Sequence, residues 1–131
     1  MQVKGVVWLG TRTSRFDEMV VFAENVLGLD ADHREKGLAV FELPDGGTFE
    51  VFGEEHPGGG HPASGVVSGF LVEDASAAAA ELSAAGVEVS AVARAGDYSW
   101  AYFKAPDGNL YEVTSGPYRQ AATSTAGVEQ T

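Results

Sequence analysis

The stretches LPDGGTFEVF at 43–52 and APDGNLYEVT at 105–114 are closely alike, and they decide the fold class. Each contains Pro-Asp-Gly, which is typical of a tight turn, followed by a run with the composition of a strand. Each strand carries a glutamate at the same place, Glu50 in the first and Glu112 in the second. A shift of 62 residues superposes the two stretches with five of ten positions identical, so the sequence predicts an internal repeat.

A helix is expected in each half of this repeat. The first begins at Ser14, with Asp17 three residues later as its partner in a capping box, and ends at Gly28. The second begins near Asp74 and ends at Gly86, and its many alanines favour a helix that packs closely on a sheet.

Strands fill the rest of each half. The same shift of 62 lays residues 7–9 on residues 69–71 as the opening strands. Three more strands are expected after each helix, at about 30–35, 38–43 and 48–53, and at about 87–93, 98–104 and 109–114. The sequence therefore predicts two tandem βαβββ modules, an α+β fold with a mixed sheet.

These elements also predict the domain boundaries. One domain spans 1–116, with module 1 at about 3–53 and module 2 at about 66–115. The stretch 54–65 is rich in glycine and proline and is expected to be a linker. The tail 117–131 has no apolar period, so we expect it to be flexible.

Composition excludes several classes of protein. Hydrophobic residues make up 44% of the chain, as in one globular domain, and the absence of cysteine excludes disulfides and thiolate metal sites. Nineteen acidic against eight basic residues give a net charge of −11, which argues against a nucleic-acid partner. There is no apolar run of membrane-spanning length and no signal-peptide pattern, so we expect a cytoplasmic protein without a membrane partner.

Two tandem βαβββ modules that each close with Pro-Asp-Gly, an aromatic residue and a glutamate resemble the vicinal oxygen chelate superfamily. This superfamily includes glyoxalase I, bleomycin-resistance proteins, extradiol dioxygenases and fosfomycin-resistance enzymes. The resemblance covers residues 3–115. It implies that the sheet curls into an open cup, and that metal-dependent members carry four ligands on the first and last strands of the two modules.

These four positions map onto Glu50, Glu112, Gly5 and Val67. Only the two glutamates can bind a metal, whereas Gly5 and Val67 leave space and apolar surface for an organic ligand. Two carboxylates leave a divalent ion mostly hydrated, so we expect no tightly bound cofactor and at most a weakly held magnesium or manganese ion. The plainer alternative is that both glutamates are solvated strand residues. Trp8 has the opposite strand parity from Gly5 and is expected in the core.

Aromatic residues are the other candidates for ligand binding. Strand alternation places Tyr98, Trp100 and Tyr102 on one face, and Ala101 with Phe103 on the opposite face toward the core. Rings with polar ends suit a planar or cationic small molecule. A dimer contact or a half-exposed strand face would explain the same pattern.

The histidines carry weaker signals. His56 and His61 lie in the expected linker, where solvated side chains are the simpler interpretation, but they are the first candidates for missing metal ligands. His33 belongs to no motif.

The leading hypothesis is a glyoxalase/bleomycin-resistance-like protein with a degenerate metal site. It would bind a small organic molecule, such as a natural product or an antibiotic, in the cup between the modules. The alternative is a divalent-metal-dependent enzyme, a lyase, isomerase or dioxygenase, in which Glu50 and Glu112 hold the cation or one of them acts as a general base. A pure interaction module is the third possibility. We also expect a homodimer, because an open sheet leaves edges uncovered.

Overall fold

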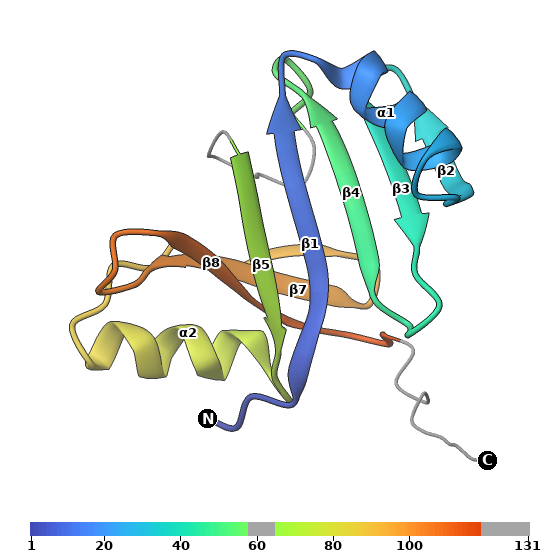
Figure 1. Cartoon of the computed structure of the whole chain (residues 1–131). Coiled ribbons are helices and arrows are strands. Elements are labelled where there is room, and N and C mark those ends of the chain that lie inside the picture. Colours follow the sequence, from blue (N-terminus) through green and yellow to red (C-terminus); the bar gives the residue numbers. More distant parts are fainter. Residues whose placement is uncertain (58–64, 119–131) are drawn as a thin grey trace. The chain divides into compact units, whose positions relative to one another are not determined.

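The computed structural model describes residues 1–57 and 65–118 (Figure 1). The chain forms two compact units, and the boundary between them falls inside the first strand. The Glu50 unit contains Trp8–Val66, and the Glu112 unit contains Met1–Val7 together with Val67–Pro117.

The Glu50 unit holds one helix against four strands. Its elements are β1 (Gly5–Thr13, from Trp8 onward), α1 (Phe16–Asn25), β2 (Ala31–Glu35), β3 (Leu38–Glu42) and β4 (Thr48–Gly53). The strand order is β2-β3-β4-β1, where β3 is antiparallel to both of its neighbours and β4 is parallel to β1. This is the order that a βαβββ module produces when its first strand pairs with its last.

The core of the Glu50 unit lies between α1 and the strands. Phe41 and Phe49 stack there with ring centroids 5.9 Å apart. They pack with Val20 and Ala23 of the helix, which are fully buried. Phe49 therefore faces the helix, on the side of β4 opposite Glu50.

The start of α1 differs from the prediction. The helix begins at Phe16 with Arg15 as its N-cap, and the N-cap side chain makes no capping hydrogen bond. The predicted cap at Ser14 is wrong because the chain enters the helix one residue later. The hydroxyl of Thr13 accepts the hydrogen bond from the Arg15 amide at 3.0 Å instead.

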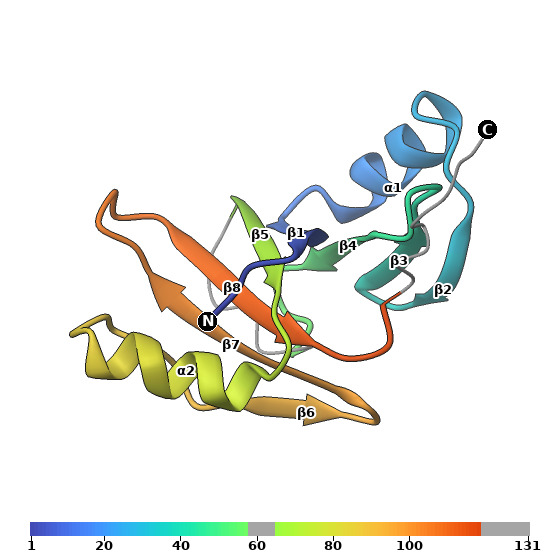
Figure 2. The same cartoon turned by 90° about the horizontal axis from the view of Figure 1, so that it is seen from below.

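The Glu112 unit repeats the arrangement. Its elements are β5 (Gly65–Leu71, from Val67 onward), α2 (Ala75–Ala84), β6 (Ala93–Ala95), β7 (Tyr98–Lys104) and β8 (Leu110–Ser115). The strand order is β5-β8-β7-β6, and Figure 2 shows α2 running alongside these strands. The predicted fold class, two βαβββ modules in an α+β fold, is confirmed.

Small residues let α2 lie close to its strands. Ala75, Ala78 and Ala79 are buried against Ala101 and Val113 in the core of the Glu112 unit. The helix begins where the sequence predicted. Its N-cap carboxylate, on the residue just before Ala75, accepts hydrogen bonds from two backbone amides of the first turn, at 2.9 and 3.2 Å.

One predicted strand is mostly absent. Of the stretch 87–93, only Val89 forms an isolated bridge, to Phe103, and β6 begins at Ala93. The hydroxyl of Ser90 explains the interruption, because it accepts the Tyr102 amide at 2.8 Å in place of a backbone carbonyl.

The predicted linker and tail fall largely outside the described residues. Of the linker, residues 58–64 and with them His61 are outside, and Gly65 already belongs to β5. Of the tail, only 117–118 are described. Within residues 1–57 and 65–118, no helix is long and apolar enough to cross a membrane.

Candidate functional site

The two glutamates lie at corresponding places in the two units. In the Glu50 unit, Glu50 of β4 pairs with Gly10 of the parallel strand β1. In the Glu112 unit, Glu112 of β8 pairs with Gly69 of β5. The opening strands thus correspond at a shift of 59 residues, whereas the closing strands correspond at 62.

This register changes which residue meets Glu50. The first-strand position two residues before Gly10 is Trp8, and the matching position before Gly69 is Val67. Gly5 is the first residue of β1, three residues before Trp8, so it does not hold the position predicted for it. The prediction failed because the shift of 62 was carried from the closing strands to the opening ones.

Trp8 and Glu50 form a hydrogen-bonded pair. The indole Nε1–H of Trp8 donates to Oε1 of Glu50 at 3.0 Å. Trp8 is only 6% exposed, so it is buried as predicted, but on the strand face that carries Glu50 rather than on the face toward α1.

A glycine makes room for this indole. A Cβ atom on Gly10 would lie 2.2 Å from Cη2 of Trp8 and 2.4 Å from Cζ2. Such distances are far inside van der Waals contact. The six-membered ring of the indole therefore occupies the space that any side chain at position 10 would need.

Burial sets the acidity of Glu50. Desolvation of its carboxyl group raises the pKa, and the hydrogen bond from Trp8 offsets this in part because it favours the charged form. A carboxyl group with a raised pKa is a stronger base than an exposed glutamate.

The same face continues with Arg12 and Phe52. These residues are paired in the β1–β4 register, and the Arg12 guanidinium carbon lies 5.2 Å from the centre of the Phe52 ring. Nη1 of Arg12 donates to the carbonyl oxygens of Gly53 and His56, at 2.9 and 2.6 Å. Arg12 thus fixes the chain that leaves β4.

In the Glu112 unit, the predicted residues come together around Glu112. Its neighbour on β7 is Tyr102, and the next pair on the same face is Trp100 with Thr114. Glu112 is 3% exposed and Tyr102 is 6% exposed. The predicted parity of β7 is confirmed, since Ala101 lies in the core under α2.

Exposure along β7 rises toward Tyr98. Trp100 is half-buried, and Tyr98 is 36% exposed, with its hydroxyl donating to the carbonyl of Pro117 at 3.4 Å. The three aromatic residues share a face, but only Tyr102 is enclosed.

The described histidines lie elsewhere. Nε2 of His33 and Nε2 of His56 each contact one oxygen of Glu35, at 2.7 and 2.9 Å. These contacts lower the pKa of Glu35, with the His56 bond as the larger cause. His56 therefore joins Glu35 on β2 rather than Glu50.

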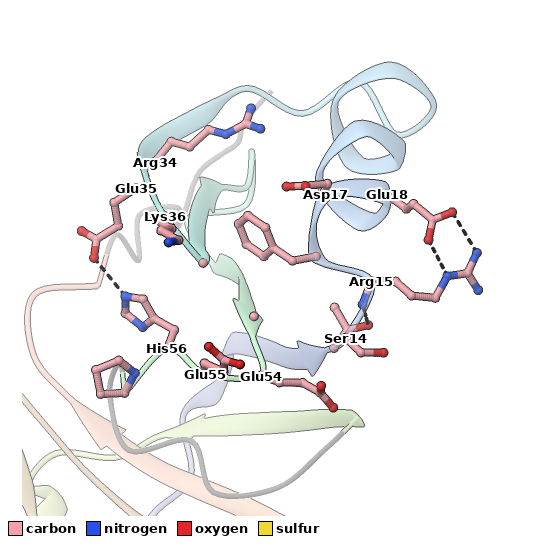
Figure 3. A pocket seen from close by; sticks show the side chains of 15 residues that line it. Ser14, Arg15, Asp17, Glu18, Arg34, Glu35, Lys36, Glu54, Glu55 and His56 are labelled. Atoms are coloured by element: carbon pink, nitrogen blue, oxygen red, sulfur yellow. Dashed lines mark hydrogen bonds and ion pairs between the residues drawn. The ribbon is translucent and has the colours of Figure 1, made fainter.

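A wide hollow of about 960 Å³ borders these residues in the Glu50 unit. It is formed by the start of α1, the β2–β3 turn and the chain after β4 (Figure 3). Two pairs of its charged side chains contact each other, Arg15 with Glu18 at 2.6 Å and His56 with Glu35 at 2.9 Å. The rest of its lining mixes polar and apolar groups, and no motif in the sequence predicts this hollow.

The family assignment follows from a comparison with known families. A profile described as the Glyoxalase/Bleomycin resistance protein/Dioxygenase superfamily matches residues 5–113. The chain belongs to this superfamily. Among curated proteins, no sequence matches significantly.

Solved structures of superfamily members have the same fold. Methylmalonyl-CoA epimerase from Mycobacterium tuberculosis aligns with a TM-score of 0.67 at 18% identity, over 92% of this chain and 93% of that one. A variant of the Streptomyces coelicolor epimerase, in complex with 2-nitronate-propionyl-CoA, gives 0.65 at 19%, over 88% and 96%. A superfamily member from Vibrio splendidus 12B01 gives 0.62 at 18%, over 87% and 99%. At these identities the likeness establishes the fold alone.

The residues at the superfamily's metal positions do not suit a resident metal ion. Trp8 and Val67 hold the first-strand positions. The indole nitrogen only donates hydrogen bonds, and valine has no ligand atom. Within the described part of the chain, no group of three or more histidine or acidic side chains could hold an ion.

Proposed function

We propose that this superfamily member binds a small organic molecule through Glu50, without a resident metal. The observation that carries the proposal is the hydrogen bond from Trp8 to Glu50. In place of a metal ligand, the first strand supplies an N–H donor that orients the carboxylate and an aromatic ring that excludes water from one side of it.

The Glu112 unit offers a second binding surface of similar character. Tyr102 and Trp100 lie on the strand face of Glu112, and Val67 adds apolar surface at the first-strand position. Aromatic rings beside a carboxylate suit a planar or cationic molecule. The net charge of −11 is compatible with a cationic ligand, as for the bleomycin-resistance type of protein.

Proton transfer is a second candidate function, and one observation favours it. Because burial raises the pKa of Glu50, this carboxyl group could remove a proton from a substrate as a general base. The epimerases among the structural neighbours make this reaction class worth testing, although they share no more than the fold.

The first experiment is a ligand screen by thermal shift and calorimetry. Bleomycin serves as the cationic probe, and a panel of neutral aromatic compounds as the comparison. We expect Glu50→Gln to weaken binding of a hit at the Glu50 surface at least tenfold, and Trp100→Ala to do the same for a hit at the Glu112 surface. Glu55→Gln is the control, because it removes the same charge from an exposed residue in the chain after β4, outside the proposed binding surface. Equal effects of Glu50→Gln and Glu55→Gln would refute the proposed binding residue.

Elemental analysis tests the metal hypothesis directly. We expect no equivalent of zinc or iron in untagged protein, and at most weak binding of magnesium or manganese. One equivalent of zinc that is lost in both Glu50→Gln and Glu112→Gln would reverse the proposal. It would favour a metal-dependent lyase, isomerase or dioxygenase instead.

We propose a cytoplasmic homodimer, since superfamily members commonly pair. Light scattering at micromolar concentration tests the assembly, and a monomer mass would exclude the dimer.

A further inference from the structure

The two carboxylate oxygens of Glu50 differ in their hydrogen bonds. Oε1 of Glu50 accepts the indole N–H, whereas no described residue donates a hydrogen bond to Oε2. The side chain is half-buried, so part of its surface stays open to a ligand.

We infer that Trp8 is a positioning residue that commits Oε1 of Glu50 as an acceptor and leaves Oε2 as the atom that meets the ligand. The inference rests on the proposed role of Glu50 and specifies it to one atom. The indole nitrogen carries a hydrogen at all relevant pH values and cannot accept one. A proton on Glu50 is therefore favoured on Oε2 while the indole bond is intact, because the carbonyl oxygen of a carboxylic acid accepts a hydrogen bond better than its hydroxyl oxygen does.

Gly10 is the second part of this arrangement. The indole can lie beside Glu50 only because position 10 has no side chain, as the 2.2 Å approach of Cη2 shows. Gly10 has an ordinary extended backbone, so conformational freedom does not explain a glycine there. We attribute the glycine to the space that its missing side chain leaves for the Trp8 ring.

This assignment narrows the chemistry of the ligand. A guanidinium group binds a carboxylate best through two parallel N–H donors, one to each oxygen. With Oε1 already engaged by Trp8, Glu50 favours a single donor such as an ammonium, a hydroxyl or an acidic C–H group. A ligand whose recognition depends on a guanidinium fork is disfavoured.

The test needs no ligand, because the indole N–H reports on Glu50. The chain has two tryptophans, so a nitrogen–proton spectrum contains two indole signals, and that of Trp100 is an internal control. We expect the Trp8 signal of the wild-type protein to shift as Glu50 titrates, and to move upfield in Glu50→Leu. The Trp100 signal should follow neither change. A Trp8 signal that ignores both the titration and the substitution would overturn the inference.

Two further variants separate positioning from packing. Trp8→Phe keeps an aromatic ring but removes the donor, so the Glu50 carboxyl signal should titrate at higher pH than in the wild type. Gly10→Ala keeps Trp8 but displaces its ring, and it should raise the Glu50 titration in the same direction. An unchanged Glu50 titration in folded Gly10→Ala protein would show that the ring is not seated on Gly10 and would overturn the inference.

The outcome is distinguishable from failure of the proposed function. If every ligand probe fails while the indole signal follows Glu50, the positioning is real and the proposed ligand is wrong. If a probe binds through Glu50 while the Trp8 indole signal does not follow the Glu50 titration, Glu50 is a binding residue but Trp8 does not position it.

Discussion

The two modules have the same closing turn and the same glutamate, yet they place different residues opposite that glutamate. Glu50 faces Trp8, a hydrogen-bond donor, whereas the matching first-strand position near Glu112 is Val67, which has no polar group. The repeat has kept the backbone pairing of each carboxylate. The residue on the neighbouring strand determines what the carboxylate can do. The two modules therefore differ in the residue that the first strand presents beside the glutamate.

The cores under the two helices also differ in the residues that fill them. In the Glu50 unit, the buried stack of Phe41 on Phe49 fills the space below α1. In the Glu112 unit, α2 contributes alanines, and Phe103 is only partly buried beside Tyr111. One module depends on large rings for its core, and the other depends on close approach of the helix.

The largest expected effect tests this difference between the cores. Phe41→Ala should lower the free energy of unfolding by about 3–5 kcal/mol, because it empties a fully buried ring position. Phe103→Ala removes the ring at the matching place of β7 and should cost clearly less, since that ring is partly exposed. Urea unfolding measures both variants. Equal losses of unfolding free energy would contradict the proposed difference between a core filled by large rings and a core closed by close approach of the helix.

The closing strands could be predicted because their signals are local. Pro-Asp-Gly fixes the turn, and alternation after it assigns Glu50 and Glu112 to one face. The opening strand gives no such signal. The run VVWLG at 6–10 is apolar on both faces, so its parity cannot be read, and Trp8 was assigned to the wrong side. The expected helix starts, Ser14 and about Asp74, lie about 60 residues apart, which already departs from the shift of 62.

The next prediction compares the two helix starts. Asp74→Ala should destabilise the protein by about 1 kcal/mol, because its carboxylate accepts two backbone N–H groups of α2. Ser14→Ala should have almost no effect, since α1 begins one residue later and its N-cap makes no side-chain bond. Thermal unfolding of both variants tests this. A loss of stability in Ser14→Ala as large as that in Asp74→Ala would show that the capping box predicted from the sequence does form.

Side-chain hydrogen bonds account for the other missed features. The hydroxyls of Thr13 and Ser90 each bind a backbone amide that the sequence pattern assigns to a different partner. Such side-chain bonds compete with helix starts and strand ladders, but they leave no periodic signal in the sequence. They are visible only in the three-dimensional structure.

Two glutamates of the Glu50 unit should show opposite dependence on pH. Burial raises the pKa of Glu50, so folding binds its proton more tightly, and stability falls as the pH rises from about 4.5 through the raised value. Hydrogen bonds from His56 and His33 lower the pKa of Glu35, so its contribution is present above about 4.5 and is lost as the pH falls through the lowered value.

Substitution by glutamine separates these two contributions. The melting temperature of Glu50→Gln relative to the wild type should increase between pH 4 and pH 8, because the neutral amide avoids the cost of a buried charge. Its carbonyl still accepts the Trp8 N–H. The melting temperature of Glu35→Gln relative to the wild type should decrease as the pH rises from acid toward neutral. Parallel curves for the two variants would contradict the assigned environments.

The smallest expected effect concerns the turns themselves. In the second turn, the Tyr111 hydroxyl donates to Oδ2 of Asp107 at 2.7 Å, and the backbone amide of Asn109 donates to Oδ1 at 2.9 Å. Both bonds lower the pKa of Asp107, and the Asn109 amide is the larger cause. The first turn has a phenylalanine, Phe49, in place of the tyrosine, while Asp45 still accepts a backbone amide at 2.8 Å.

Tyr111→Phe converts the second turn to the pattern of the first. Because the Asn109 amide remains, the pKa of Asp107 should rise only part of the way toward its ordinary value, and the loss of stability should be the smallest of those predicted here. The ring stacks on Phe70 and Phe103, at 5.8 Å each, persist in the variant and keep the strand in place. Carbon NMR of the Asp107 carboxyl group gives the pKa, and thermal unfolding gives the stability. Suppose that the pKa of Asp107 returned fully to the ordinary value of an aspartate in this variant. The Tyr111 hydroxyl rather than the Asn109 amide would then be what lowers the pKa of Asp107, and the two turns would be stabilised by different hydrogen bonds.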